Sequence, residues 1–205
     1  GSAVLDKQLS NFALENYIAG LEFLSCIPGS IGGAIRMNAG CYGYDISKCI
    51  ASIQVVDRNG IVRTIRSEKI NFFYRGSDLS NDLIFLSGTF KGEKQDSKKI
   101  KEKMEKLLAL KKKSQPSKIK TCGSTFKNPI NQTQKKTWEL IKEAQCENMK
   151  IGGASISEKH SNFFVNEDSA TSNDMENLIS LVREKVFNTT GIKLELELQI
   201  IGEKK

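Results

Sequence analysis

The sequence predicts an α+β protein, in which helical and strand-like segments occupy separate parts of the chain. Residues 50–57 and 61–66 are rich in β-branched side chains and flank Asn59-Gly60, the strongest short hairpin signal. Residues 94–113 place Ile100, Met104, Leu107 and Leu108 at helical spacing. Residues 193–201 alternate apolar and polar side chains, which is typical of a strand. These three patterns require both kinds of element.

The first hundred residues contain three further expected features. Residues 4–16 carry apolar side chains at three- and four-residue steps, which predicts a short amphipathic helix. Residues 26–34 are too rich in glycine for a simple helix or strand and are expected to form a loop. Residues 84–90 are expected to form another strand.

A second region follows Gln115-Pro116, because a residue that precedes proline is disfavoured in a helix. We expect one helix over about residues 135–144 and another over 174–187. Thr171 to Asp174 have the pattern of a capping box at the start of the second helix.

Composition limits the possible functions. The chain has 205 residues, 39% of them hydrophobic and 27% charged, which predicts a globular protein with a real core. No stretch reaches the roughly 20 apolar residues of a membrane span, and the first residues lack a secretory signal, so a cytoplasmic location is expected. The five scattered cysteines and the single histidine predict neither a disulfide framework nor a metal site.

The net charge of +7 leaves two interpretations of the lysine-rich helix and the residues after it. Lys111 to Lys113, with Lys118 and Lys120, could follow nucleic-acid phosphates. However, no aromatic side chains interleave with these lysines as stacking platforms. The charge therefore favours solubility, or binding of a small anionic ligand, and no nucleic-acid partner is expected.

The glycine-rich segment is a candidate anion site. Gly29, Gly32 and Gly33 would let backbone N–H groups approach a phosphate or pyrophosphate, and Ser30 adds a hydroxyl donor. The segment matches neither the P-loop nor the dinucleotide-binding fingerprint. A tight turn explains these glycines equally well.

Three other residues could carry chemistry. Ser124 is not in a hydrolase elbow, but a serine can donate a proton to a basic carbanion or enol. Arg75 stands beside aromatic residues and could stabilise developing negative charge, or it could form an ordinary structural ion pair. Glu197 shares one face of the last expected strand with Glu195, where both could simply face water.

Eight segments, in this order along nearly the whole chain, resemble the UDP-N-acetylenolpyruvoylglucosamine reductase (MurB) family of flavoenzymes. The segments are Gly20–Phe23, Ile27–Ala34, Met37–Gly43, Tyr74–Ser77, Gln115-Pro116, Gly123–Pro129, His160–Asn166, and Leu194–Glu197 with Ile201-Gly202. The resemblance implies part of a PCMH-type FAD-binding domain at residues 1–112. It implies a substrate-binding domain at residues 113–205, whose final strand returns to the active site.

The family reduces UDP-N-acetylglucosamine enolpyruvate to UDP-N-acetylmuramate in peptidoglycan synthesis, and so in cell-wall biogenesis, cell shape and cell division. The resemblance implies FAD as cofactor and NADPH as co-substrate. Hydride would pass to the enolpyruvyl double bond, and the resulting enolate-like species would be protonated. The implied partner is a small-molecule UDP-sugar, without a membrane, and the complete protein is expected to be a monomer.

The resemblance also assigns roles by position. Arg75 matches the arginine that, with the glutamate matched by Glu197, polarises the substrate carboxylate, and Ser124 matches the serine that protonates the intermediate. A carboxylate beside the substrate carboxylate must be protonated or paired with Arg75. The matched cofactor-binding positions are Pro28, Gly29, Ser30, Ile31, Gly32, Gly33, Asn38 and Gly40. The substrate-binding positions are Tyr74, Asn128 and one lysine of 111–113, taken as Lys113, whereas His160 is expected to be structural.

Two further expectations concern the extent of the chain. Residues 1–6 resemble the middle of the family sequence, so the N-terminal FAD subdomain is expected to be missing. The spacing from Arg75 to Ser124 is similar to the branch of the family without the extra substrate-capping loop. The alternative to an active FAD-dependent reductase is therefore a truncated, flavin-free UDP-sugar-binding fragment without activity. Flavin content would separate these two possibilities.

Overall fold

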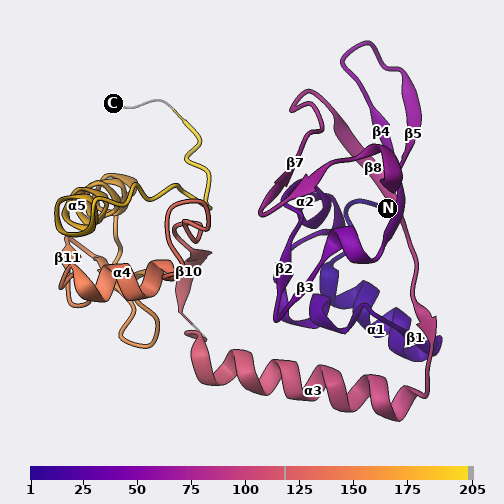
Figure 1. Cartoon of the computed structure of the whole chain (residues 1–205), viewed down its shortest axis with the longest axis horizontal. Coiled ribbons are helices and arrows are strands. Elements are labelled where there is room, and N and C mark those ends of the chain that lie inside the picture. Colours follow the sequence, from indigo (N-terminus) through magenta and orange to yellow (C-terminus); the bar gives the residue numbers. More distant parts are fainter. Residues whose placement is uncertain (118, 203–205) are drawn as a thin grey trace. The chain divides into compact units, whose positions relative to one another are not determined.

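The computed structural model describes residues 1–117 and 119–202 and divides the chain into two compact units, Gly1–Lys111 and Lys112–Lys205 (Figure 1). Lys118, which the sequence places in the basic group, lies outside the described residues. The boundary falls within the long helix α3 (Ser97–Ser114). Each unit has its own buried apolar cluster.

The centre of the first unit is a three-stranded antiparallel sheet in the order β5-β4-β8 (Val62–Arg66, Ile50–Val56 and Ile84–Phe90). The predicted hairpin and the predicted third strand are thus confirmed. Ile53 of β4 lies opposite both Ile65 and Gly88. A β-carbon at Gly88 would stand 2.9 Å from the side chain of Ile35, so this glycine lets an apolar side chain of another element lie on the sheet.

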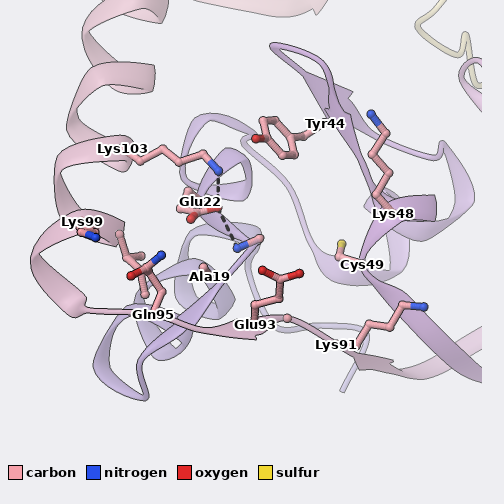
Figure 2. A pocket seen from close by; sticks show the side chains of 13 residues that line it. Ala19, Glu22, Tyr44, Lys48, Cys49, Lys91, Glu93, Gln95, Lys99 and Lys103 are labelled. Carbon is pink, nitrogen blue, oxygen red and sulfur yellow. Dashed lines mark hydrogen bonds and ion pairs between the residues drawn. The ribbon is translucent and has the colours of Figure 1, made fainter.

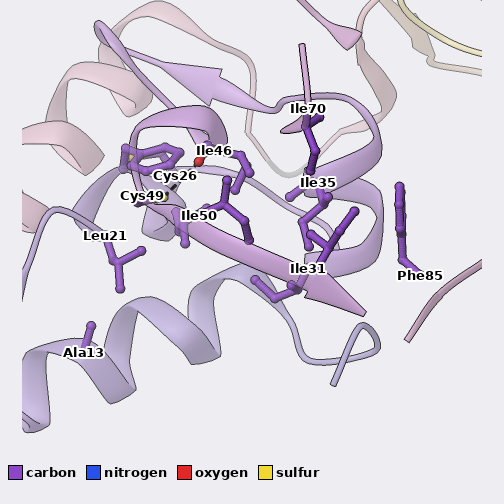
Figure 3. Close-up of a cluster of buried hydrophobic side chains, with 14 of the residues drawn as sticks. Ala13, Leu21, Cys26, Ile31, Ile35, Ile46, Cys49, Ile50, Ile70 and Phe85 are labelled. Atoms are coloured by element: carbon purple, nitrogen blue, oxygen red, sulfur yellow. Dashed lines mark hydrogen bonds between the residues drawn. The ribbon is translucent and has the colours of Figure 1, made fainter. Parts of the chain in front are cut away.

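That element is the helix α2 (Ile31–Arg36). Ile31 and Ile35 are buried with Ile50 of the sheet in one cluster (Figure 3). The loop expected over residues 26–34 is wrong in part, because this helix begins inside it. Gly32 and Gly33 are helical, since apolar packing of Ile31 and Ile35 outweighs their low helix propensity.

The remaining elements of the first unit are short except for the first helix. They are α1 (Asp6–Glu15), the 3-10 helices η1 (Glu22–Cys26), η2 (Ile46–Lys48) and η3 (Ser67–Lys69), and the paired strands β1 (Ile18–Ala19) with β9 (Glu93–Lys94), β2 (Gly40–Cys41) with β3 (Tyr44–Asp45), and β6 (Phe72–Phe73) with β7 (Gly76–Ser77).

The helix α1 forms where it was predicted, but its buried face differs. Asp6, Ser10 and Ala13 are buried, whereas Leu5 and Phe12 are more than half exposed. Its backbone amide at Asp6 donates to the carbonyl oxygen of Gly29, at 3.0 Å. This contact ties the N-terminal segment to the glycine-rich segment and fixes which side of the helix turns inward.

The second unit is a four-stranded antiparallel sheet packed against two helices. The strand order is β10-β13-β12-β11 (Lys120–Ser124, Phe163–Asn166, Ala154–Ile156 and Lys150–Ile151). The helices α4 (Thr137–Glu143) and α5 (Ser172–Thr190) confirm the two predicted helices. Thr171 and Asp174 form the expected capping box of α5.

The strand predicted over residues 193–201 is wrong as a strand. The segment makes one isolated bridge, between Leu196 and Phe126. Its alternation still has a packing meaning, because Leu194, Leu196 and Leu198 contact the core of the second unit. Ile200 and Ile201 are exposed, so the pattern ends at Leu198.

Candidate functional site

The glycine-rich segment is held by the first residues of the chain. The amides of Ile31 and Gly32 donate to the carbonyl oxygens of Val4 and Ser2, at 2.9 and 2.8 Å. Ile31 is 2% exposed, so its side chain belongs to the core. These two amides are therefore used in hydrogen bonds within the protein. The exposed members of the segment are Pro28, Gly29 and Gly33.

Within the glycine-rich segment, Gly33 is the position at which no close neighbour among the described residues requires a glycine. A β-carbon at Gly32 would stand 3.0 Å from the Ser2 side chain, and one at Gly29 would stand 3.1 Å from the Asp6 carboxylate. At Gly33 it would meet only the Ser30 hydroxyl, at 3.8 Å. A helical glycine costs about 1 kcal/mol relative to alanine, so an exposed one that packing does not require fits close approach by a ligand such as a cofactor.

Arg75 lies in the hairpin β6–β7 with a left-handed backbone, at φ +58°. Its Nη2 donates to the carbonyl oxygen of Gly40 at 3.1 Å, and its guanidinium carbon stands 4.9 Å from the centre of the Tyr74 ring. The side chain is half-buried. The structure thus brings together two sequence-predicted positions, Arg75 and Gly40.

Asn38 and Gly40 lie in the turn that follows α2. Asn38 is 5% exposed, and its amide group donates to the Phe73 carbonyl and accepts from the Ser47 amide, at 3.0 Å each. A β-carbon at Gly40 would stand 2.3 Å from the Tyr44 carbonyl oxygen. Both residues are therefore explained by the fold around Arg75, and their side-chain positions face inward.

A lysine-rich pocket of about 540 Å³ lies in the same unit and was not predicted from the sequence (Figure 2). Its charged lining consists of Lys48, Lys91, Lys99, Lys103, Glu22 and Glu93. Glu22 is 3% exposed and accepts from the Gly20 amide at 3.0 Å and from Lys103 at 3.3 Å. Burial opposes the charge of Lys103, but hydrogen bonding to Tyr44 and Glu22 outweighs it and raises the Lys103 pKa. The residues that line this pocket lie far apart in the sequence, so no motif spacing predicts it.

Ser124 ends the strand β10 of the second unit, beside an irregularity in its pairing with β13. Gly123 before it has φ +85°, and Thr121 donates from its hydroxyl to the Phe164 carbonyl at 2.7 Å. The positive φ at Gly123 turns the chain out of the regular strand ladder. Glycine is the residue that adopts this backbone conformation without strain. Ser124 is half-buried at this turn.

The backbone of Glu197 is hydrogen-bonded to that of Thr125, the residue after Ser124. The Glu197 amide donates to the carbonyl oxygen of Thr125 at 2.9 Å, and the Lys127 amide donates to that of Glu195 at 2.8 Å. Glu197 is half-buried. Glu195 is exposed and forms a 3.9 Å ion pair with Lys127, so the two glutamates have different surroundings.

The predicted substrate-binding positions differ in what they contact. Asn128 accepts from the amide of Thr137, at the start of α4, at 3.0 Å. Lys113 is exposed on α3. Lys111 donates from its Nζ to the Cys26 carbonyl at 2.6 Å, so it has a structural partner within the first unit.

His160 has the environment of a structural residue. Its Nδ1 accepts from the Asn162 amide at 3.2 Å, and its ring lies 4.8 Å from that of Phe163, edge to face. Burial lowers the pKa of the imidazole, which therefore stays neutral at pH 7. This geometry agrees with the expected role in ordering the loop.

In residues 1–117 and 119–202, no group of three or more histidine, cysteine, aspartate or glutamate side chains could hold a metal ion. Within the same ranges, no helix has the length and apolar character needed to cross a membrane.

Comparisons with known proteins match both units. Residues 115–201 match the family model described as UDP-N-acetylenolpyruvoylglucosamine reductase, C-terminal domain, and residues 1–66 match an FAD binding domain. The chain is 52% identical over 201 residues to a UDP-N-acetylenolpyruvoylglucosamine reductase of Pelagibacter ubique, covering 98% of this chain and 67% of that protein. It is 44% identical over 203 residues to the reductase of Rickettsia typhi, covering 99% and 68%.

A solved structure is also similar. The crystal structure of the reductase (MurB) from Thermus caldophilus superimposes with a TM-score of 0.85 at 30% identity, covering 97% of this chain and 70% of that one. The predicted α+β fold, an FAD-binding region followed by a MurB C-terminal domain, is therefore confirmed. The chain belongs to the UDP-N-acetylenolpyruvoylglucosamine reductase (MurB) family, an oxidoreductase family.

Proposed function

We propose that this chain uses FAD and NADPH to reduce UDP-N-acetylglucosamine enolpyruvate to UDP-N-acetylmuramate, in the cytoplasm and as a monomer. The product would supply peptidoglycan synthesis and thereby cell division. The observation that carries the proposal furthest is Gly33, an exposed helical glycine that packing does not require, within a region that matches an FAD binding domain.

The residues that would hold FAD are the exposed part of the glycine-rich segment, Pro28, Gly29 and Gly33, with the Ser30 hydroxyl beside them. Bound FAD would supply the hydride that the enolpyruvyl double bond accepts. The absence of a side chain at Gly33 would let the cofactor approach the backbone. Gly40 and Asn38 would maintain the turn after α2 and its contact with the hairpin of Arg75, rather than contact the cofactor through side chains.

Arg75 would bind the carboxylate of the enolpyruvyl group. Its guanidinium is permanently charged, half-buried and already fixed by the Gly40 carbonyl and the Tyr74 ring. A fixed cation stabilises the negative charge that develops on the carboxylate oxygens without reorganising during the reaction. Glu197, which the resemblance matches to a glutamate of the family, would also take part in recognising this carboxylate, and it would have to be protonated or paired with a cation because two bare carboxylates repel.

Ser124 would donate its hydroxyl proton to the carbon next to the carboxylate. A serine hydroxyl is a weak acid, but an enolate carbon is basic enough to take its proton. Its half-buried position at the irregular end of β10 would limit competition from water. Tyr74, Asn128 and Lys113 would contact the substrate, with Lys113 near the diphosphate.

The cofactor is tested by the absorbance spectrum of the purified chain before and after FAD is added and removed by desalting. Retained flavin bands, followed by NADPH-dependent formation of UDP-N-acetylmuramate, support the proposal. A colourless chain that still binds the UDP-sugar would instead support the alternative, a flavin-free UDP-sugar-binding function without activity.

A further inference from the structure

The hairpin that carries Arg75 is fastened to the turn after α2 by hydrogen bonds in both directions. Asn38 Nδ2 donates to the Phe73 carbonyl at 3.0 Å, and Arg75 Nη2 donates to the Gly40 carbonyl at 3.1 Å. The two donors come from opposite partners, so neither segment can shift along the other without breaking a bond. Phe73 ends the strand β6 and Arg75 lies in the turn that follows, so one hydrogen bond holds the strand and the other holds the turn.

The surroundings of Asn38 orient its side chain for the hydrogen bond to the Phe73 carbonyl. It is 5% exposed, and its Oδ1 accepts from the Ser47 amide at 3.0 Å while its Nδ2 faces Phe73. The Ser47 bond fixes the orientation of the amide, so the donor points at the hairpin. Its backbone is left-handed, at φ +41°, a region in which asparagine is enriched among residues other than glycine.

The hairpin itself leaves little freedom for adjustment. Arg75 is left-handed as well, at φ +58°. A β-carbon at Gly76 would stand 2.4 Å from the Phe73 ring, so that ring closes over the turn. A strained residue persists in such a conformation only when its surroundings determine it.

A second residue of the α2 end holds the chain after the hairpin. The Arg36 guanidinium donates to the carbonyl oxygens of Ser80 and Leu83, at 3.0 and 2.7 Å, and its central carbon lies 4.5 Å from the centre of the Phe85 ring. Arg36 therefore supports the downstream segment, but Asn38 is the side chain that reaches the hairpin itself.

We propose that Asn38 is a positioning residue for Arg75, holding the guanidinium where it meets the enolpyruvyl carboxylate. The inference rests on the proposed function and deepens it, because it names a residue that would set the position of the arginine. Arg75 would take part only in the half-reaction in which the UDP-sugar is reduced. Loss of the Asn38–Phe73 bond should therefore slow reoxidation of the flavin by the UDP-sugar and leave flavin reduction by NADPH unchanged.

The test uses Asn38→Asp in the full chain loaded with FAD. Aspartate tolerates the left-handed backbone and can still accept from Ser47, but it cannot donate to the Phe73 carbonyl. The control for the loss of a hydrogen bond of this kind is Asn16→Asp, at an exposed position of the same unit, because Asn16 Nδ2 also donates to a backbone carbonyl, that of Phe12, at 2.8 Å. Both half-reactions are followed by anaerobic stopped-flow absorbance.

The expected result is about a tenfold loss in the reoxidation rate for Asn38→Asp, as misplacement of a charged group by a fraction of an ångström produces. Flavin reduction should be unchanged, and Asn16→Asp should match the wild type in both. Adding Asn38→Asp to Arg75→Ala should cost nothing more. An unchanged reoxidation rate, or an equal loss in both half-reactions, would overturn the inference.

Hydrogen exchange separates this inference from the proposed function. If the wild-type flavin is not reoxidised by the UDP-sugar, the proposed function fails. The positioning inference is then decided by amide exchange over residues 72–77. Faster exchange in Asn38→Asp than in Asn16→Asp supports it, and equal exchange overturns it.

Discussion

Asn162 and Phe126 exchange two hydrogen bonds in the core of the second unit. The Phe126 amide donates to Asn162 Oδ1 at 3.0 Å, and Asn162 Nδ2 donates to the Phe126 carbonyl at 2.8 Å. The Thr125 amide also donates to the Asn162 carbonyl, at 2.8 Å. One buried side chain therefore holds the segment directly after Ser124.

Asn162→Ala should destabilise the second unit by about 3 kcal/mol. It leaves the Phe126 amide and carbonyl buried without partners, and each such group costs about 1–3 kcal/mol. Urea unfolding followed by circular dichroism measures this loss. Asn173→Ala, which changes an exposed residue of α5, is the control and should be within about 0.5 kcal/mol of the wild type.

Asp6 should make the first unit more stable in mild acid. The residue is 1% exposed, neither carboxylate oxygen has a hydrogen-bond partner, and burial raises its pKa to about 6. The folded state holds this proton more tightly than the unfolded state, so stability falls as the pH rises from about 4 to about 6 and then stays level. The contribution is about 3 kcal/mol over that range.

Asp6→Asn removes the titrating group and provides the comparison. The difference in unfolding free energy between variant and wild type should grow in favour of the variant as the pH rises from 4 to 7. A difference that is constant over this range would contradict the assigned burial of an unpartnered carboxyl.

His160 should titrate below its ordinary value of 6.5, because burial disfavours the charged ring. It is the only histidine in the chain, so its ring proton signals can be followed directly by NMR. The folded state binds this proton less well than the unfolded state. Its contribution to stability is therefore present above pH 6.5 and is lost as the pH falls toward the lower folded value. A midpoint at or above 6.5 would show that the ring is not buried.

Gly33→Ala and Gly40→Ala should separate ligand binding from folding. Alanine at Gly33 meets no close neighbour and favours the helix, so thermal stability should be kept while FAD retention after desalting falls. Alanine at Gly40 would approach the Tyr44 carbonyl oxygen at 2.3 Å, so stability itself should fall. Gly33→Ala with the flavin content of the wild type would remove the argument for cofactor approach at this position.

Local patterns predicted much of the fold. The Asn59-Gly60 turn, the strand at residues 84–90 and the capping box of α5 depend on nearby residues, and the structure contains all three. The strand expected over residues 193–201 failed because alternation reports which side of a segment is buried. It does not report whether a neighbouring strand continues beside that segment.

The candidate site was less accessible to sequence reasoning. The pattern at residues 26–34 indicated a loop, but long-range packing of Ile31 and Ile35 makes part of it a helix. The contacts that fix the predicted residues, Asn38 with Phe73 and Asn162 with Phe126, join segments more than thirty residues apart. Motif resemblance named the positions of Arg75 and Ser124, and their roles stay predictions.

The most direct test of the proposed function is anaerobic reoxidation of the flavin. The chain is loaded with FAD and reduced with NADPH, and UDP-N-acetylglucosamine enolpyruvate is then added while the visible flavin band is followed. We predict that the band returns with one equivalent of the UDP-sugar, that UDP-N-acetylmuramate forms, and that Arg75→Ala slows the return. A band that stays bleached in the wild-type protein, with the UDP-sugar unchanged, would contradict the proposed function.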